Sequence, residues 1–234
     1  MANTPRQTTT TLTALALGLL ALVLGVARPC LGSSGVSVSS VVTEAFFNGI
    51  KNQAGNGCEG KNFYTRGAFL SAADSFPAFA HGGSEADGKR EIAAFFAHTT
   101  FETGCKLMIN RANVFCDASS SQWPCASGKK YYGRGPLQIS WNFNYGPAGK
   151  AVGFNGLGDP DAVARDPVIS FKTALWIWMN QAHQVMVTQG FGATIKAISP
   201  LECGGGGAQM NARVKYYEQY CQQLGVDPGN NLTC

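Results

Sequence analysis

The sequence predicts a mainly α-helical protein (α+β) with a small β element. Apolar residues recur at helical spacing in residues 89–103, 169–184 and 208–224. Residues 131–145 alternate enough to predict a short strand or two. Strands and helices do not follow one another in the βαβ manner, and no internal repeat is present. A single helical domain with a little sheet is therefore expected.

The amino-terminal half of the domain is expected to hold three helices. Residues 41–52 place Val42, Phe46 and Ile50 at helical spacing, and a second helical segment covers residues 68–73. The third helix, residues 89–103, is the clearest. Its apolar face consists of Ile92, Phe95, Phe96 and Thr99, and Gly104 is a natural stop signal.

The carboxy-terminal half begins with irregular, cysteine-bearing residues 105–128. Glycine and proline then interrupt the alternating stretch 131–145. The helix predicted over 169–184 is rich in large apolar residues, and the amphipathic helix predicted over 208–224 follows a run of four glycines.

Residues 1–32 have the layout of a secretory signal peptide. Arg6 precedes an apolar run over residues 12–26, and small residues follow it. A membrane anchor is the alternative, but that run is shorter than the roughly 20 residues that span a bilayer, and Arg28 comes directly after it. We therefore expect export, a small-residue linker over 33–40, and one domain over 41–234. No later stretch is apolar enough to predict a membrane span.

The charge of the chain is low. Removing residues 1–32 takes away two of the 18 basic residues and none of the 14 acidic ones, so the formal charge falls from +4 to +2. A nucleic-acid partner requires a dense basic face, which argues against that class of function. The 14% of charged residues and 29 glycines predict a compact, loop-rich domain.

The chain has eight cysteines, and export makes disulfides the expected state. Zinc is disfavoured because neither a CxxC spacing nor clustered histidines accompany them. Position favours the pairs Cys116–Cys125 and Cys203–Cys234, but connectivity cannot be derived from sequence. If Cys30 leaves with the leader, one of the remaining seven cysteines has no partner. Asn231 begins a glycosylation sequon.

Glu102 is the first candidate for chemistry. It lies at the carboxyl end of the helix predicted over 89–103, where the helix dipole disfavours a negative charge. The neighbouring Phe101 also favours a protonated carboxyl, which is the form that a general acid needs. By position alone, an exposed glutamate at a fraying helix end is the simpler interpretation.

Residues 130–146 mix aromatic side chains with the polar Gln138, Ser140, Asn142 and Asn144. Sugars present apolar ring faces and a rim of hydroxyls, so such a surface suits them. Core aromatics with polar residues facing water are the commoner alternative. A phosphate loop is a poor interpretation of Gly133 to Gly135, because the later glycine and the strand-to-helix context are missing.

Taken together, these segments resemble plant chitinases of glycoside hydrolase family 19, class IV in particular. The most specific match is residues 129–149, KKYYGRGPLQISWNFNYGPAG. It is accompanied by AAFFAHTTFETG at 93–104, AFFNGI at 45–50, GKNFYTR at 60–66 and NNLTC at 230–234. The resemblance extends from about Val36 to Cys234. The cysteine-rich amino-terminal chitin-binding module of class IV is not found.

The resemblance implies a lysozyme-like, two-lobed, mainly helical fold with a cleft for β-1,4-linked N-acetylglucosamine. It implies a secreted (extracellular or vacuolar) monomer without a metal or other cofactor, with chitin oligomers as the partner, and defence against fungi as its role. It also implies three disulfides and one lone cysteine. The disulfide candidates are Cys58, Cys105, Cys116, Cys125, Cys203 and Cys234.

Family members cleave with inversion, which requires a glutamic acid and a second glutamate that activates water. Glu102 matches the acid. Counting forward without gaps places Arg111 at the position of the base, and aligning Cys105 with the family's cysteine places it near Met108 or Ile109. Residues 103–116 contain no Asp or Glu, so the base is missing in either register.

Other positions partly keep the family pattern. The resemblance implies sugar or water contacts for Tyr132, Gln138, Ser140, Asn144 and Lys172, and a supporting pair, Glu202 and Arg213. Phe101 and Phe143 replace the family's His and Tyr, and Ser199 replaces an Asn that contacts the substrate.

Three functions stay open. The favoured one is a chitinase-derived protein that binds chitin oligomers and hydrolyses them poorly or not at all. The alternative is an active endochitinase that uses Glu102 as acid and an unidentified base. A wall protein with a structural or antifungal role, whose cleft no longer matters, is the third.

Overall fold

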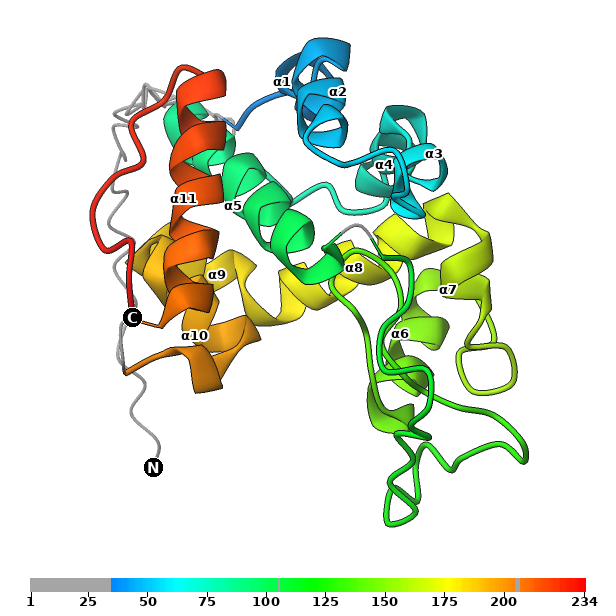
Figure 1. The fold of residues 1–234 in the computed structure, drawn as a ribbon. Coiled ribbons are helices and arrows are strands. Elements are labelled where there is room, and N and C mark those ends of the chain that lie inside the picture. Colours follow the sequence, from blue (N-terminus) through cyan, green and yellow to red (C-terminus); the bar gives the residue numbers. More distant parts are fainter. Residues whose placement is uncertain (1–34, 105, 205–206) are drawn as a thin grey trace, which may run out of the picture. The chain divides into compact units, whose positions relative to one another are not determined.

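The computed structural model describes residues 35–104, 106–204 and 207–234. The predicted leader and the cysteines Cys30 and Cys105 lie outside this described part. The described chain is mainly helical (Figure 1). Within it, no helix is both long and apolar enough to cross a membrane.

The first predicted helix is divided in two. Helix α1 spans Val38–Val41 and α2 spans Glu44–Asn52. The break occurs because Thr43 is extended and its side chain accepts a hydrogen bond from the Phe46 amide at 3.1 Å, which starts a new helix. Val36 is buried, so part of the stretch 33–40 that was expected to be a linker packs on the domain.

Helices α3 (Gly60–Phe63) and α4 (Arg66–Ala73) follow, and Thr65 caps α4. The central helix α5 spans Glu85–Thr103. It begins four residues before the predicted start because Ser84 and Asp87 form a capping box. It ends as predicted at Gly104, which has a left-handed backbone with φ of 44°.

The prediction of strands over 131–145 is wrong. Only isolated β-bridges occur in the described chain, Met108 with Arg134 and Arg134 with Ile139. Left-handed backbone at Gly135 and Gln138, with Pro136 between them, turns the chain too sharply for a ladder. Helix α6 (Asn142–Val152) then begins inside the predicted strand.

The carboxy-terminal half contains the remaining helices. They are α7 (Ala162–Arg165), α8 (Pro167–Gln181), α9 (His183–Gln189), α10 (Phe191–Ile198), the 3-10 helix η1 (Pro200–Glu202) and α11 (Ala208–Gln223). The helix predicted over 169–184 therefore corresponds to α8 and the start of α9, separated at Ala182. The Asp166 side chain accepts from the Val168 and Ile169 amides and caps α8.

Two helix pairs organise the domain. Helix α11 packs along α5, and α4 packs on α8 (Figure 1). Aromatic rings fill the space between them, and five of these rings are nearly or fully buried: Phe47, Phe69, Phe95, Phe96 and Trp178. The pairing of α5 with α11 matters for function because it brings residues more than 100 positions apart to the carboxyl end of α5.

The cysteines form the two bridges that position favoured, Cys116–Cys125 and Cys203–Cys234. Cys58 is also disulfide-bonded. Among the described cysteines, Cys221 on α11 is buried with a free thiol.

Candidate active site

Glu102 lies in the last turn of α5, where α11 places Arg213 against it. The Glu102 side chain is 18% exposed, and its Oε1 accepts a hydrogen bond from Arg213 Nη2. This environment differs from the apolar helix end that the sequence predicts for this glutamate.

Arg213 is the centre of the site and is 1% exposed. Its Nε and Nη2 donate to the two carboxylate oxygens of Glu202, both at 2.8 Å, in a bidentate pair. A buried guanidinium is costly without such partners. Glu202 therefore supports Arg213 in the way that the resemblance implies.

The cluster of Glu102, Glu202 and Arg213 contains two carboxylates and one guanidinium. Arg213 donates to both carboxylates, so one guanidinium joins the two acidic side chains at the carboxyl end of α5.

His98 completes the shell around Arg213, and sequence reasoning missed it. His98 Nδ1 lies 3.0 Å from Arg213 Nη1, and its Nε2 lies 2.8 Å from Thr194 Oγ1. Because a guanidinium only donates, Nδ1 is the acceptor and Nε2 carries the proton. Burial, with the charge of Arg213, holds the pKa of His98 well below its usual value. The signal was present in the sequence, since His98 precedes Glu102 by four residues and shares its helix face.

Two departures from the family pattern also contact Arg213. The guanidinium lies over the Phe101 ring, 4.2 Å from its centroid. Ser199 Oγ accepts from Arg213 Nη2 at 3.1 Å. Both residues therefore hold the side chain that positions Glu102.

Four of the predicted sugar-contact residues form a second group on the segment 131–145. Gln138 Nε2 donates to the Gly135 carbonyl at 2.7 Å, Ser140 Oγ donates to the Gln138 carbonyl at 3.0 Å, and Asn144 Nδ2 donates to the Ser140 carbonyl at 2.9 Å. The fourth is Tyr132. Within the described chain the buried Gln138 Oε1 has no hydrogen-bond partner. These bonds fix the orientation of the three side chains.

A buried arginine holds this segment in shape. Arg134 stacks on Tyr132, with its central carbon 3.6 Å from the ring centroid, and donates to the Tyr132 carbonyl at 3.1 Å. It also donates to the Tyr145 hydroxyl at 2.9 Å and to Asp161 Oδ1 from Nε at 2.9 Å. Burial raises the pKa of Tyr145 far above its usual range, so this hydroxyl stays neutral.

The segment after Glu102 crosses beside residues 133–135. The Ile109 amide donates to the Gly133 carbonyl at 3.0 Å, and the Gly135 amide donates to the Leu107 carbonyl at 3.1 Å. This pairing places Met108 beside the sugar-contact group, where its Sδ is 3.7 Å from the Tyr132 hydroxyl. Arg111 is exposed.

Two other features frame the site. Trp141 and Phe143 are each 39% exposed and stack with centroids 5.8 Å apart, next to Asn144. Lys172 lies on α8 and is half-buried, and within the described chain it forms no hydrogen bond or ion pair with either group. No group of three or more His, Cys, Asp or Glu residues in the described part is arranged to hold a metal ion.

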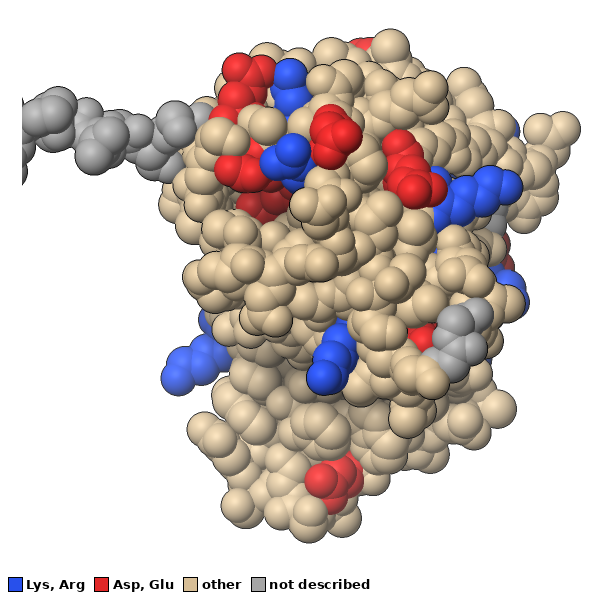
Figure 2. All heavy atoms as spheres, turned by 90° about the vertical axis from the view of Figure 1, so that its left-hand side faces the viewer, with Lys and Arg blue, Asp and Glu red and all other residues tan. Residues whose placement is uncertain are grey.

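The face in Figure 2 is largely uncharged, with mixed acidic and basic residues.

Comparison with known proteins agrees with this fold. The family described as "Chitinase class I", glycoside hydrolase family 19, matches residues 41–189. The chain belongs to this family of glycoside hydrolases.

Its relatives include plant endochitinases. The chain is 71% identical over 203 residues to Endochitinase A of Zea mays, which covers 85% of this chain and 72% of that protein. It is 67% identical over 207 residues to Chitinase 5 of Oryza sativa subsp. japonica, covering 86% and 72%.

Solved structures give the same result. A class IV family 19 chitinase from Zea mays superposes with a TM-score of 0.80 at 70% identity, covering 84% of this chain and 98% of that one. Chitinase C from Streptomyces griseus gives 0.76 at 40% identity, covering 86% and 100%. The predicted mainly helical, lysozyme-like fold is confirmed.

Proposed function

We propose that this protein is a secreted member of the chitinase family that binds oligomers of β-1,4-linked N-acetylglucosamine and hydrolyses them at a strongly reduced rate. Residues 1–32 serve as its secretory leader, and the domain acts as a monomer outside the cell or in the vacuole. Names of relatives such as Endochitinase A support chitin as the ligand.

The observation that carries the proposal is the missing general base. Residues 103–116 have no Asp or Glu, although an inverting reaction needs a second carboxylate that activates water on the far face of the sugar ring. Losing one partner of a general acid–base pair lowers the rate by about 10²–10⁴-fold.

Binding does not require that base. In the proposal Gln138, Ser140 and Asn144 present amide and hydroxyl groups to the sugar, and the exposed rings of Trp141 and Phe143 offer apolar faces beside them. Tyr132, Lys172 and Ser199 contribute further polar contacts. Glu102 remains the proton donor, positioned by Arg213 and Glu202.

The possible positions of the lost base, which are Arg111 in one register and Met108 or Ile109 in the other, differ in their surroundings. Met108 lies against the Tyr132 hydroxyl, whereas Arg111 is exposed. We therefore place the lost base at Met108. We therefore expect Met108→Glu, rather than Arg111→Glu, to restore hydrolysis.

The test compares hydrolysis of chitin hexamer by the native protein, Met108→Glu and Arg111→Glu, with Glu102→Gln added to each as a control. We expect Met108→Glu to raise the rate by about a hundredfold or more, and Glu102→Gln to abolish the gain. A native rate equal to that of Met108→Glu, lost on Glu102→Gln, would show that the native protein already has a base.

An active endochitinase is the second candidate, favoured by 71% identity to Endochitinase A. Among the described carboxylates, Asp161 is the one whose Oδ1 lies 3.5 Å from the Tyr132 hydroxyl. The same Oδ1 also accepts hydrogen bonds from Nε and Nη2 of Arg134, so the oxygen that would activate water is already occupied. Loss of native hydrolysis in Asp161→Asn, with hexamer binding retained, would identify Asp161 as the replacement.

A further inference from the structure

A pocket of about 380 Å³ lies beside the carboxyl end of α5, outside the two groups of residues described above. Its walls come from α2, the loop after it, α3 with the following Tyr64, and α5, with one residue each from α8 and α11 and Pro136 from the segment 131–145. Thr103 and Gly104 line it, so it reaches the residues next to Glu102. Neither Glu102, Arg213 nor the sugar-contact residues line it.

The inner part of the pocket is aromatic. Phe47, Tyr64, Phe96 and Phe171 all line it. Their rings contact one another edge to face: Phe47 lies 5.9 Å from Phe96 and 6.4 Å from Phe171, and Tyr64 lies 5.4 Å from Phe171, between centroids. Rings in this arrangement accept a further flat ring in the same edge-to-face or offset geometry.

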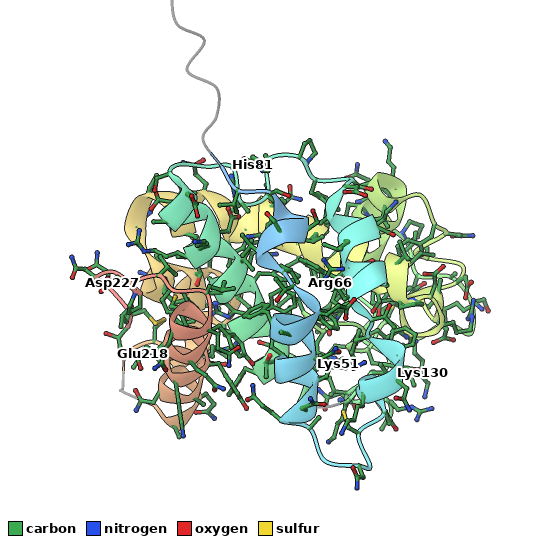
Figure 3. The ribbon with its side chains drawn as sticks, turned by 90° about the horizontal axis from the view of Figure 1, so that it is seen from above. Lys51, Arg66, His81, Lys130, Glu218 and Asp227 are labelled. Carbon is green, nitrogen blue, oxygen red and sulfur yellow. A yellow bond between two sulfur atoms is a disulfide. The ribbon has the colours of Figure 1, made fainter. Side chains whose placement is uncertain are left out.

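The charged residues that line the pocket are both basic. Lys51 and Lys61, the basic rim, line it, and no acidic residue of the described chain does. Lys51 lies on the side of α2 that faces α3 (Figure 3), and no described carboxylate forms an ion pair with it. Lys61 Nζ donates to the Ala54 carbonyl at 3.2 Å, which holds it at the same loop.

Thr99 and Thr103, two of the three threonines on the α5 wall, do not offer free donors, and the third, Thr100, is hydrogen-bonded to the Tyr220 hydroxyl at 2.9 Å. Thr99 Oγ1 donates to the Phe96 carbonyl at 3.2 Å, and Thr103 Oγ1 donates to the Thr99 carbonyl at 2.9 Å. Because these hydroxyl protons are used within the helix, the basic rim supplies the donors for a ligand. The pocket therefore combines an aromatic interior with a cationic edge.

We propose that this pocket binds a small aromatic carboxylate, with its ring against the edges of Phe47, Phe96 and Phe171 that reach the pocket wall and its carboxylate at Lys51 and Lys61. The volume suits a ligand of this size, since small-molecule sites begin at about 300 Å³. The proposal does not depend on chitin binding or hydrolysis, because the two sites share no side chain.

The loop after α2 offers a way to close the pocket and a matched control. Gly55 lines the pocket and Gly57 does not. A Cβ at either position would meet no atom within 4 Å, and neither glycine has a left-handed backbone. Gly55→Trp therefore places a ring at the mouth of the pocket, whereas Gly57→Trp places the same ring on the same loop away from it.

The experiment is titration calorimetry of the mature, oxidised protein with trans-cinnamate and with its neutral analogue cinnamamide. We expect cinnamate to bind at least tenfold more tightly than cinnamamide. Lys51→Gln should weaken the binding of cinnamate about tenfold, because a hydrogen bond to a charged group is lost. Gly55→Trp should abolish cinnamate binding, and Gly57→Trp should not.

Three results would overturn the proposal. Equal affinity for cinnamate and cinnamamide would remove the role of the basic rim. Unchanged binding in Gly55→Trp would place the ligand elsewhere. Octanoate binding more tightly than cinnamate would show that the interior selects an aliphatic chain. Hexamer binding, measured on the same samples, reports separately on the proposed function.

Discussion

Replacing Arg213 by Met should destabilise the fold strongly, because that side chain is the shared partner of three buried or half-buried groups. Arg213 is 1% exposed, and Glu102 and Glu202 are 18% and 17% exposed. The substitution leaves two carboxylates facing each other without a cation. It also leaves His98 Nδ1 without its donor.

The magnitude follows from this burial. Breaking a buried ion pair by removing one partner costs about 3–5 kcal/mol. Because water reaches both carboxylates in part, we expect the lower end, about 3 kcal/mol. For a domain of about 200 residues this lowers the melting temperature by roughly 6–12 °C.

Thermal unfolding followed by circular dichroism, with urea unfolding for the free energy, measures the change. Arg165→Met is the matched control, since Arg165 pairs with Asp159 at 2.6 Å but is 61% exposed. Exposed pairs contribute little, so this control should melt with the native protein. A melting temperature of Arg213→Met that also stays at the native value would refute the assigned role of Arg213.

Three further substitutions test other parts of the structure. Burial lowers the pKa of His98. The native fold therefore loses stability as the pH falls below about 6.5, because the unfolded histidine gains a proton there and the buried one does not. His98→Gln should reduce this acid-side loss in a plot of unfolding free energy against pH. The hydrogen bond to Glu91 raises the pKa of His183. The stabilisation by protonated His183 is therefore fully present below about pH 6.5 and is lost as the pH rises through the raised pKa. His183→Gln should remove this pH-dependent loss, and an unchanged plot of unfolding free energy against pH would contradict the pairing. The Cys203–Cys234 bridge closes a separation of 31 residues, so Cys234→Ser should cost about 3–4 kcal/mol in urea unfolding. Because Glu202 directly precedes Cys203, Cys234→Ser should also weaken the binding of chitin hexamer. Unchanged hexamer binding would show that the disulfide does not support the candidate site.

The long helices could be predicted because a buried helix face leaves a regular apolar pattern in the sequence. The pattern does not show where a helix is interrupted. A side-chain cap at Thr43 divides the first helix, and a backbone kink at Ala182 divides the helix predicted over 169–184. Both are local hydrogen-bonding events within a continuous apolar pattern.

The prediction of strands over residues 131–145 failed for a different reason. Its aromatic residues alternate because Tyr131 and Tyr145 pack in the interior, not because the chain forms a ladder. The polar centre of that packing is Arg134 with Asp161, a pair 27 positions apart that no local period reveals.

The candidate site was predictable only in part. Glu102 and the residues of 132–144 lie in motifs that the family resemblance covers. The hydrogen bond from Arg213 to Glu102 joins positions 111 residues apart, and it depends on how α11 packs along α5. His98 could have been found from its spacing to Glu102, but its tautomer depends on Arg213 and Thr194.

The most direct test of the proposed function is a long incubation of the mature, oxidised protein with chitin hexamer beside Glu102→Gln, with products separated by chromatography and binding measured by calorimetry. We predict that both proteins bind the hexamer and that the native protein yields at most about one hundredth of the product of Met108→Glu. Rapid product formation by the native protein, abolished in Glu102→Gln, would contradict the account and show that a carboxylate outside residues 103–116 activates the water.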